Sequence, residues 1–144
     1  MKRSKSRAPV PLSAGERRRL MRAARAALRR SYARYSKFRV GAAILTERGA
    51  LYSGCNVENA SYGLTNCAER TAIHSAVAAE GKGFKGVKVR AVAVVNGKEL
   101  PCSPCGACRQ VIFEFGPQAV VLFKAAAGWK QSHITELLPD SFRF

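Results

Sequence analysis

The sequence predicts an α/β fold, a three-layer α/β/α sandwich around one mixed sheet of about five strands. Two observations favour this class. Apolar runs typical of strands alternate along the chain with segments whose apolar residues recur at helical spacing. Two strand-like runs also lie close enough in the sequence to form an antiparallel hairpin. Strands that alternate with helices bury their apolar faces by packing the helices on both sides of a sheet.

Most of the net charge lies near the N-terminus. The chain has 144 residues and a net charge of +16, and residues 1–39 hold fourteen Lys and Arg but a single Glu. We expect residues 1–12, which mix basic residues, serines and two prolines, to form a disordered basic tail, and residues 13–144 to form a single domain. The basic segment could bind nucleic acid or an anionic surface, or it could be a solvated tail and helix face.

The first helix is expected to begin after Ser13. Ser13 and Glu16 match a capping box, in which each side chain accepts a hydrogen bond from the backbone N–H of the other residue. Apolar residues follow at helical spacing, at Leu20, Ala24, Ala27 and Leu28. Arginines surround this stripe, so we expect one face of the helix to pack and the rest to be solvated.

A hairpin and a second helix follow. Residues 39–46 and 50–57 are strand-like runs on either side of a short glycine-containing turn. Residues 67–80 are rich in alanine, and Gly81 is placed to end this helix in a left-handed cap. The expected apolar positions of the helix are Ala68, Ala72, Ala76 and Ala79.

The second half of the chain continues the alternation. Residues 87–95 form a nearly continuous Val and Ala run, which is typical of a strand buried on both faces. Pro104 is suited to the first turn of a third helix that ends near Gly116. Another apolar strand is expected at residues 119–123, with a short strand near Trp129 and a helical turn at 134–138.

Five cysteines point to metal binding rather than to disulfides. The chain contains no run of eighteen apolar residues and no secretory signal, so we expect a cytoplasmic protein without a membrane span. The reducing cytoplasm keeps thiols free, and five cysteines cannot all pair within one monomer. Clustered cysteines are therefore interpreted as ligands, and Cys55 and Cys102 as packing residues.

Two motifs contain the residues suited to chemistry. They are residues 67–70, with the sequence Cys-Ala-Glu-Arg, and residues 104–110, with the sequence Pro-Cys-Gly-Ala-Cys-Arg-Gln. Both are expected at helix N-termini, where unpaired N–H groups stabilise thiolates. Cys67, Cys105 and Cys108 would then hold one zinc ion and leave the fourth tetrahedral position open, as in catalytic zinc sites.

Two other kinds of site fit part of this pattern. A closed four-cysteine zinc site could recruit Cys55 or Cys102 as its fourth ligand. An iron–sulfur site could use the CxxCxxC run that begins at Cys102, although the further cysteine expected after it is missing. Glu69 argues against both, because a structural site needs no free carboxylate beside a ligand, whereas activation of water does.

With these motifs in view, the chain resembles the small homotetrameric cytidine deaminases. The resemblance also covers residues 35–42 (YSKFRVGA), residues 54–62 (GCNVENASY) and residues 136–139 (ELLP). It implies one Zn²⁺ per subunit, a tetramer with shared active sites, and hydrolysis of cytidine and deoxycytidine to uridine and deoxyuridine. The paired CxE and PCxxC motifs are a known signature of zinc deaminases.

The resemblance also implies roles for individual residues. Glu69 would transfer protons. Arg70 and Gln110 would stabilise the zinc ligands without binding the metal themselves. Asn56 and Glu58 would bind the ribose 3′-hydroxyl. The other implied substrate contacts are Phe38, the Ala68 backbone and, from a neighbouring subunit, Ala60, Tyr62 and Phe142.

Three other functions compete with this interpretation. The basic N-terminus and the zinc motifs also fit a deaminase of cytosine in RNA or DNA. A carboxylate at Glu58 that accepts a hydrogen bond from a free 3′-hydroxyl would repel the 3′-phosphate of a continuous strand. This favours the free nucleoside as substrate over RNA or DNA. The chain could also deaminate a modified cytosine nucleoside, or bind RNA or a membrane through its basic arm on a deaminase scaffold.

Overall fold

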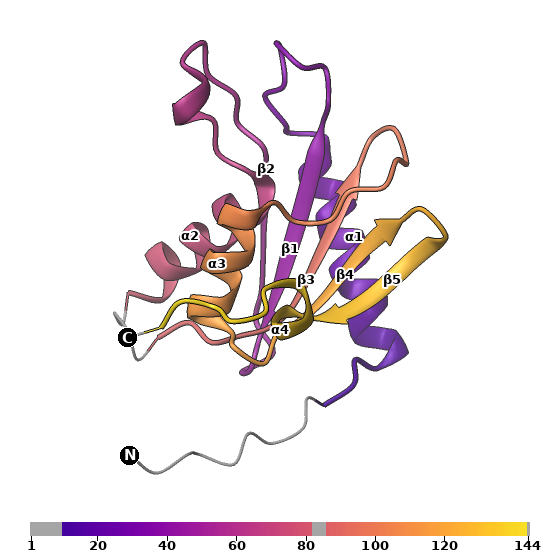
Figure 1. Ribbon diagram of the computed structural model, residues 1–144, viewed down its shortest axis with the longest axis vertical. Helices are drawn as coiled ribbons and strands as arrows, with labels where there is room; N and C mark the ends of the chain where they lie inside the picture. The colour runs from indigo at the N-terminus through magenta and orange to yellow at the C-terminus, as the bar shows by residue number, and fades with distance from the viewer. Residues whose placement is uncertain (1–9, 82–85, 144) are drawn as a thin grey trace.

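Five strands form one mixed sheet with the order β2-β1-β3-β4-β5 (Figure 1). Their bounds are β1 Val40–Thr46, β2 Leu51–Cys55, β3 Val89–Asn96, β4 Val120–Ala125 and β5 Gly128–His133. β3 and β4 pair in parallel, whereas the other neighbouring strands pair antiparallel. This computed structural model describes residues 10–81 and 86–143, and its sheet confirms the predicted hairpin and mixed topology.

Helices cover both faces of the sheet (Figure 1). α1 (Ala14–Leu28) lies on one face, and α2 (Ala68–Glu80) and α3 (Gly106–Phe115) lie on the other. Short helices at Tyr62–Leu64 (η1) and Ile134–Leu137 (α4) complete the described elements. Successive residues of β3 alternate between the two cores, so that Ala93 packs with the α1 residues and Val92 with those of α2 and α3. The predicted three-layer sandwich is therefore confirmed.

The capping box positions α1 against the sheet. Ser13 and Glu16 form the two reciprocal hydrogen bonds that the sequence predicts. Glu16 also pairs with Arg90 on β3, which ties the start of the helix to the sheet. Leu20 and Ala24 are fully buried, and Gly41 lets the helix approach β1, because a β-carbon there would lie 2.1 Å from the Ala24 carbonyl oxygen.

Glycine at position 54 allows α2 to lie directly on β2. A β-carbon on Gly54 would lie 2.4 Å from the backbone nitrogen of Ala72 and 2.7 Å from the carbonyl oxygen of Ala68. Real β-carbons essentially never come this close to other atoms, so either the strand or the helix would have to move.

We therefore expect Gly54→Ala to lower the free energy of unfolding by about 2–3 kcal/mol, because overpacking against backbone cannot be relieved by a change of rotamer. Urea denaturation monitored by circular dichroism would measure the shift. Gly63→Ala is the matched control, since a β-carbon there meets nothing within 4 Å. Equal transition midpoints for the two variants would contradict the close approach of α2 to β2.

Three local details differ from the sequence predictions or limit them. α3 begins at Gly106 with Cys105 as its N-cap, so Pro104 precedes the helix and does not lie in its first turn. Ala79 is exposed, because the buried stripe of α2 ends at Ala76. Of the predicted tail, residues 10–12 have neither helix nor strand, and residues 1–9 lie outside the described residues.

No helix within 10–81 or 86–143 has the length and hydropathy needed to cross a membrane.

Candidate active site

Three cysteine sulfurs meet where α2 and α3 begin. Cys67 is the N-cap of α2, Cys105 is the N-cap of α3, and Cys108 follows in the first turn of α3. Neither N-cap side chain caps its own helix, so both sulfurs remain available as ligands. The three sulfurs lie within 4.8 Å of one another, and those of Cys67 and Cys105 are 3.9 Å apart.

This spacing fits zinc. A tetrahedral zinc ion with Zn–S bonds of about 2.3 Å holds its sulfurs about 3.8 Å apart. Two helix N-termini converge on the sulfurs, and their unpaired N–H groups stabilise negative charge. The predicted cofactor, Zn²⁺, is supported by this cluster. Within the described part of the chain, Cys67, Cys105 and Cys108 are its members, and no fourth ligand side chain joins them.

The remaining two cysteines do not join the cluster. Cys55 and Cys102 are half-buried, and Cys102 packs against the apolar core beneath α2 and α3. Burial raises the pKa of the Cys102 thiol to about 11, which favours the neutral form. A closed four-cysteine site and an iron–sulfur cluster both need a fourth cysteine. The geometry therefore favours an open three-cysteine site.

Glu69 lies beside the cluster in the first turn of α2. Its side chain is only 4% exposed, and burial raises the pKa of its carboxyl group above the ordinary value. The negative charge of Cys67 raises this pKa further. A carboxyl group shielded from bulk water and adjacent to a metal site is suited to carrying a proton over short distances.

Arg70 provides the positive charge next to the thiolates. Its Nη2 donates a hydrogen bond to the Cys67 sulfur over 3.3 Å. Hydrogen bonds from the Cys108 thiol and from Arg70 lower the pKa of Cys67 to about 5, so this ligand is a thiolate at neutral pH. The hydrogen bond to Cys67, together with burial, raises the pKa of Cys108. The Nε atom of Arg70 is buried and has no hydrogen-bond partner within the described residues.

Arg109 is a positioning residue that the sequence reasoning missed. Its Nε donates to the carbonyl oxygen of Pro104 over 2.8 Å, and its Nη1 donates to that of Leu137 over 2.8 Å. A third bond of 3.3 Å reaches the hydroxyl of Ser103. One guanidinium therefore fixes the loop before Cys105 against the end of α4. Its place directly after Cys108 was the available signal, but its two shorter hydrogen bonds reach backbone carbonyls, which no motif reveals.

Asn56 and Glu58 are buried and face the segment of residues 31–40. Asn56 accepts a hydrogen bond from the backbone N–H of Val40 over 2.9 Å, accepts another from the Ser31 hydroxyl, and donates to the carbonyl oxygen of Phe38 over 2.9 Å. Phe38 itself is half-buried. Asn56 therefore holds the backbone on both sides of Arg39, directly after Phe38, an arrangement that the sequence reasoning did not predict.

The Glu58 carboxylate accepts hydrogen bonds from three groups of residues 35 and 36. These are the backbone N–H of Tyr35, at 2.8 Å, the backbone N–H of Ser36, at 3.2 Å, and the Ser36 hydroxyl. The Ser36 hydroxyl and these N–H groups lower the pKa of Glu58, so it is ionised at neutral pH. A hollow of about 400 Å³ opens beside it, lined by Tyr35, Ser36, Glu58, Asn59, Tyr62 and Thr65.

The other predicted site residues lie at three places. Ala68 is fully buried at the first position of α2, beside the cysteines. Ala60 and Tyr62 lie on the exposed loop that contains η1, and Tyr62 is 82% exposed. Phe142 is 67% exposed, and its carbonyl oxygen accepts a hydrogen bond from Gln110 over 3.3 Å. The Gln110 amide thus reaches the C-terminal segment.

The fold and the cluster of three cysteines together define a zinc-binding enzyme. The family described as the cytidine and deoxycytidylate deaminase zinc-binding region matches residues 15–124. This chain belongs to that family, as the motifs at residues 67–70 and 104–110 predicted.

Individual relatives agree with this assignment. A cytidine deaminase of Sporosarcina psychrophila is 49% identical over 114 residues, which cover 78% of this chain and 80% of the relative. The crystal structure of a cytidine deaminase from Burkholderia pseudomallei aligns with a TM-score of 0.77 at 45% identity, over 91% of this chain and 100% of that one. A blasticidin-S deaminase of Bacillus cereus is 35% identical over 111 residues, covering 72% of this chain and 76% of the relative.

Proposed function

We propose that this chain catalyses the hydrolytic deamination of cytidine and deoxycytidine, with release of ammonia and formation of uridine or deoxyuridine, and that it serves pyrimidine salvage. The observation that carries the proposal is the buried Glu69 carboxyl group beside three cysteine sulfurs that fit one zinc ion. A hydrolytic deamination needs an attacking water and proton transfers to the ring and to the leaving amine.

Cys67, Cys105 and Cys108 would hold the zinc ion. When bound, zinc supplies a Lewis acid that lets water act as a nucleophile near neutral pH. Glu69 takes one proton from the attacking water and passes it to ring nitrogen 3. It then takes the remaining proton from the new hydroxyl on ring carbon 4 and passes it to the amino group, which leaves as ammonia as the carbonyl forms. One carboxylate can serve all of these transfers because it is buried beside the cysteines that would hold the metal.

Residues of two loops would hold the substrate. Phe38 packs against the pyrimidine, the Ala68 backbone contacts the base, and Asn56 and Glu58 bind the 3′-hydroxyl of the sugar. The carboxylate of Glu58 is ionised because Ser36 and nearby N–H groups lower its pKa. An ionised carboxylate accepts a hydrogen bond from a free 3′-hydroxyl and repels a 3′-phosphate, so the site selects a nucleoside over a continuous strand.

A direct assay tests the substrate class. Purified protein is mixed in turn with cytidine, deoxycytidine, blasticidin S and a cytosine-containing oligonucleotide, and the ultraviolet change on deamination is followed. We expect turnover of both nucleosides and none of the oligonucleotide. The similarity to a blasticidin-S deaminase supports a second candidate, deamination of a modified cytosine nucleoside. Faster turnover of blasticidin S than of cytidine would establish that alternative.

Arg70 is expected to set the pH dependence of the reaction. Three thiolates outweigh the charge of one zinc ion, and this excess opposes ionisation of the attacking water. The Arg70 guanidinium, which donates to the Cys67 sulfur, offsets it. Loss of about 1.4 kcal/mol of electrostatic stabilisation by the guanidinium would raise the pKa of the attacking water by one unit. We therefore expect Arg70→Ala to move the rising limb of the pH–rate profile by about one unit toward higher pH.

The control for this prediction is Arg70→Lys, which keeps the positive charge and is expected to restore most of the shift. Zinc content is measured in all three proteins, and Arg70→Ala should lose far more activity at pH 7 than zinc. A pH–rate profile that does not change in Arg70→Ala would contradict the electrostatic role.

We also propose a homotetramer with shared active sites, built from single domains of residues 13–144 and located in the cytoplasm. Tyr62, Leu64 and Phe142 support this assembly, because they are large apolar residues that the single chain leaves exposed. Light scattering after size exclusion is expected to report four copies of the 15.6 kDa chain. A monomer that deaminates cytidine at the full rate would rule out shared sites.

A further inference from the structure

A row of arginines follows the solvent side of α1. Arg18, Arg22, Arg25 and Arg29 recur at helical spacing, so they lie along one side of the helix over about 16 Å. All four are exposed, and Arg17 lies beside the first of them. The ion pairs among the described residues join Arg90 to Glu16 and Lys124 to Glu99. The positive charge of the row is therefore not neutralised by acidic groups in that part of the chain.

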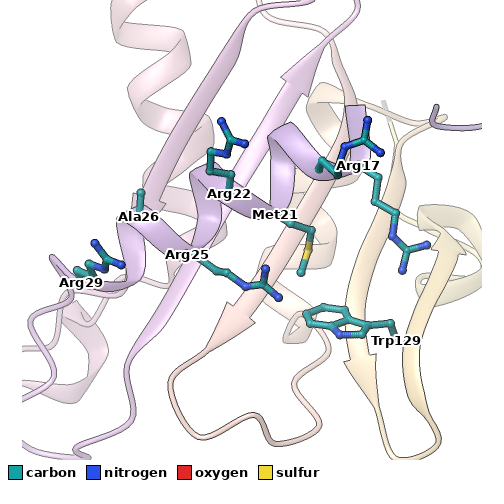
Figure 2. Close-up of a pocket in the computed structure, with 8 residues that line it drawn as sticks. Arg17, Met21, Arg22, Arg25, Ala26, Arg29 and Trp129 are labelled. Carbon is teal, nitrogen blue, oxygen red and sulfur yellow. The ribbon is translucent and has the colours of Figure 1, made fainter. Parts of the chain in front are cut away.

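The row borders a hollow that also contains an aromatic ring. This hollow of about 660 Å³ is lined by Arg17, Arg18, Met21, Arg22, Arg25, Ala26, Arg29 and Trp129. Figure 2 shows Met21 and Arg25 extending from α1 toward the indole of Trp129. A second hollow, of about 550 Å³, shares Ala26 and Arg29 with the first and continues past Arg30 to β2. A solvated charged face needs neither a concave surface nor a half-buried tryptophan at its edge.

We propose that this arginine face of α1, together with Trp129, is a binding surface for single-stranded nucleic acid. Guanidinium groups bind phosphates through paired N–H donors, and their spacing over about 16 Å matches several successive phosphates of one strand. Trp129 offers a ring on which an unpaired base can stack, which is how proteins bind single strands without reading their sequence. The surface goes beyond the proposed deamination, because it requires no chemistry on the bound strand.

An anionic membrane is the other partner that such charge could attract. A helix that lies in a membrane interface must turn an apolar face toward the lipid. The apolar face of α1 is buried in the sheet through Leu20, Ala24 and Ala27. In the described part of the chain, the large apolar side chains that are exposed belong to other segments, not to α1. The combination of charge and a ring in a groove therefore favours a polynucleotide.

The surface lies away from the candidate active site. α1 covers one face of the sheet, whereas the cysteines lie at the starts of α2 and α3 on the opposite face (Figure 1). A strand on α1 would leave the nucleoside site open, so binding and deamination can be measured independently on the same protein.

Binding is tested with the full chain and a fluorescently labelled oligouridine, which contains no cytosine to be deaminated. We compare the wild type with Arg18→Gln/Arg22→Gln/Arg25→Gln. We expect the triple variant to bind at least tenfold more weakly near 0.1 M salt. Its plot of log affinity against log salt should be less steep by about 2, since each phosphate contact on a single strand contributes about 0.7.

The matched control is Arg48→Gln/Lys88→Gln/Lys98→Gln, which removes the same charge from exposed residues elsewhere. It should keep nearly wild-type affinity, and both variants should keep the wild-type rate with cytidine. Equal losses of affinity in the two triple variants would mean that only net charge matters and would overturn the proposal. Unchanged binding by the arginine variant would overturn it as well.

The intrinsic fluorescence of Trp129 distinguishes a nucleic acid from other polyanions, because the chain has a single tryptophan. We expect oligouridine to quench this emission and heparin, which has no bases, to leave it nearly unchanged. A single-stranded DNA oligonucleotide is expected to bind more tightly than a duplex of the same length. Stronger binding to phosphatidylserine vesicles than to oligouridine would refute the proposal in favour of a membrane. Trp129→Leu, which keeps an apolar side chain, should weaken oligouridine binding about fivefold or more.

Discussion

Glu69→Gln is expected to lower kcat for cytidine by at least about a thousandfold while zinc stays bound. General acid–base catalysis by one positioned group contributes roughly 10²–10⁴ in rate, and Glu69 is proposed to move protons both to the ring and to the leaving amino group. Glutamine has nearly the same shape and can still accept a hydrogen bond, but it cannot take up or release a proton. The side chain is 4% exposed, so bulk water cannot readily replace it.

The ultraviolet assay measures kcat, and metal analysis measures zinc per chain. Glu80→Gln is the matched control, because it makes the same change at the other end of α2, where the carboxylate accepts a hydrogen bond from Tyr52. This control should keep nearly the full rate. Near-wild-type turnover by Glu69→Gln with zinc in place would remove Glu69 from the mechanism.

Cys105→Ala should lose both zinc and activity. Zinc sites made of four side chains release about 10–16 kcal/mol on binding, so one thiolate accounts for a few kcal/mol. We expect zinc affinity to fall by at least about a hundredfold, and deamination to fall with zinc content. Competition with a chromogenic chelator measures the affinity without reference to activity.

Cys102→Ala is the control for this prediction. It removes the same atoms three residues earlier, from a side chain that packs against the core and lies outside the sulfur cluster. It should retain one zinc ion per chain. Loss of zinc from Cys102→Ala and its retention by Cys105→Ala would mean that the ligand set is wrong.

Features that depend on neighbouring residues were predicted well. The capping box of Ser13 and Glu16, the left-handed Gly81 after α2 and the hairpin of β1 and β2 all occur as expected. Each depends on contacts within a few residues, which a short pattern contains. The start of α3 was predicted too early, because Pro104 suits a first turn but Cys105 has the extended backbone of an N-cap.

The chemistry of the centre was also present in local sequence. Three cysteines and a glutamate at helix starts indicate zinc and proton transfer, because thiolates prefer zinc and water activation needs a carboxylate. What local sequence does not contain is which distant groups meet. The sheet order brings Cys67 within 3.9 Å of Cys105, and burial alters the pKa of Glu69.

Asn56 and the N-terminal arginines also show the difference between what local sequence identifies and what tertiary packing determines. The sequence identifies an amide and a basic helix face, but tertiary packing places Asn56 against the backbone of residues 38–40 and places Trp129 opposite the arginines. Helix and turn signals arise from interactions between close neighbours in the chain. The site residues, the basic helix face and the preference for zinc could therefore be predicted from the sequence. Contacts between remote segments depend on how the whole sheet and its helices pack. The hydrogen-bond and packing partners of each side chain therefore required the folded structure.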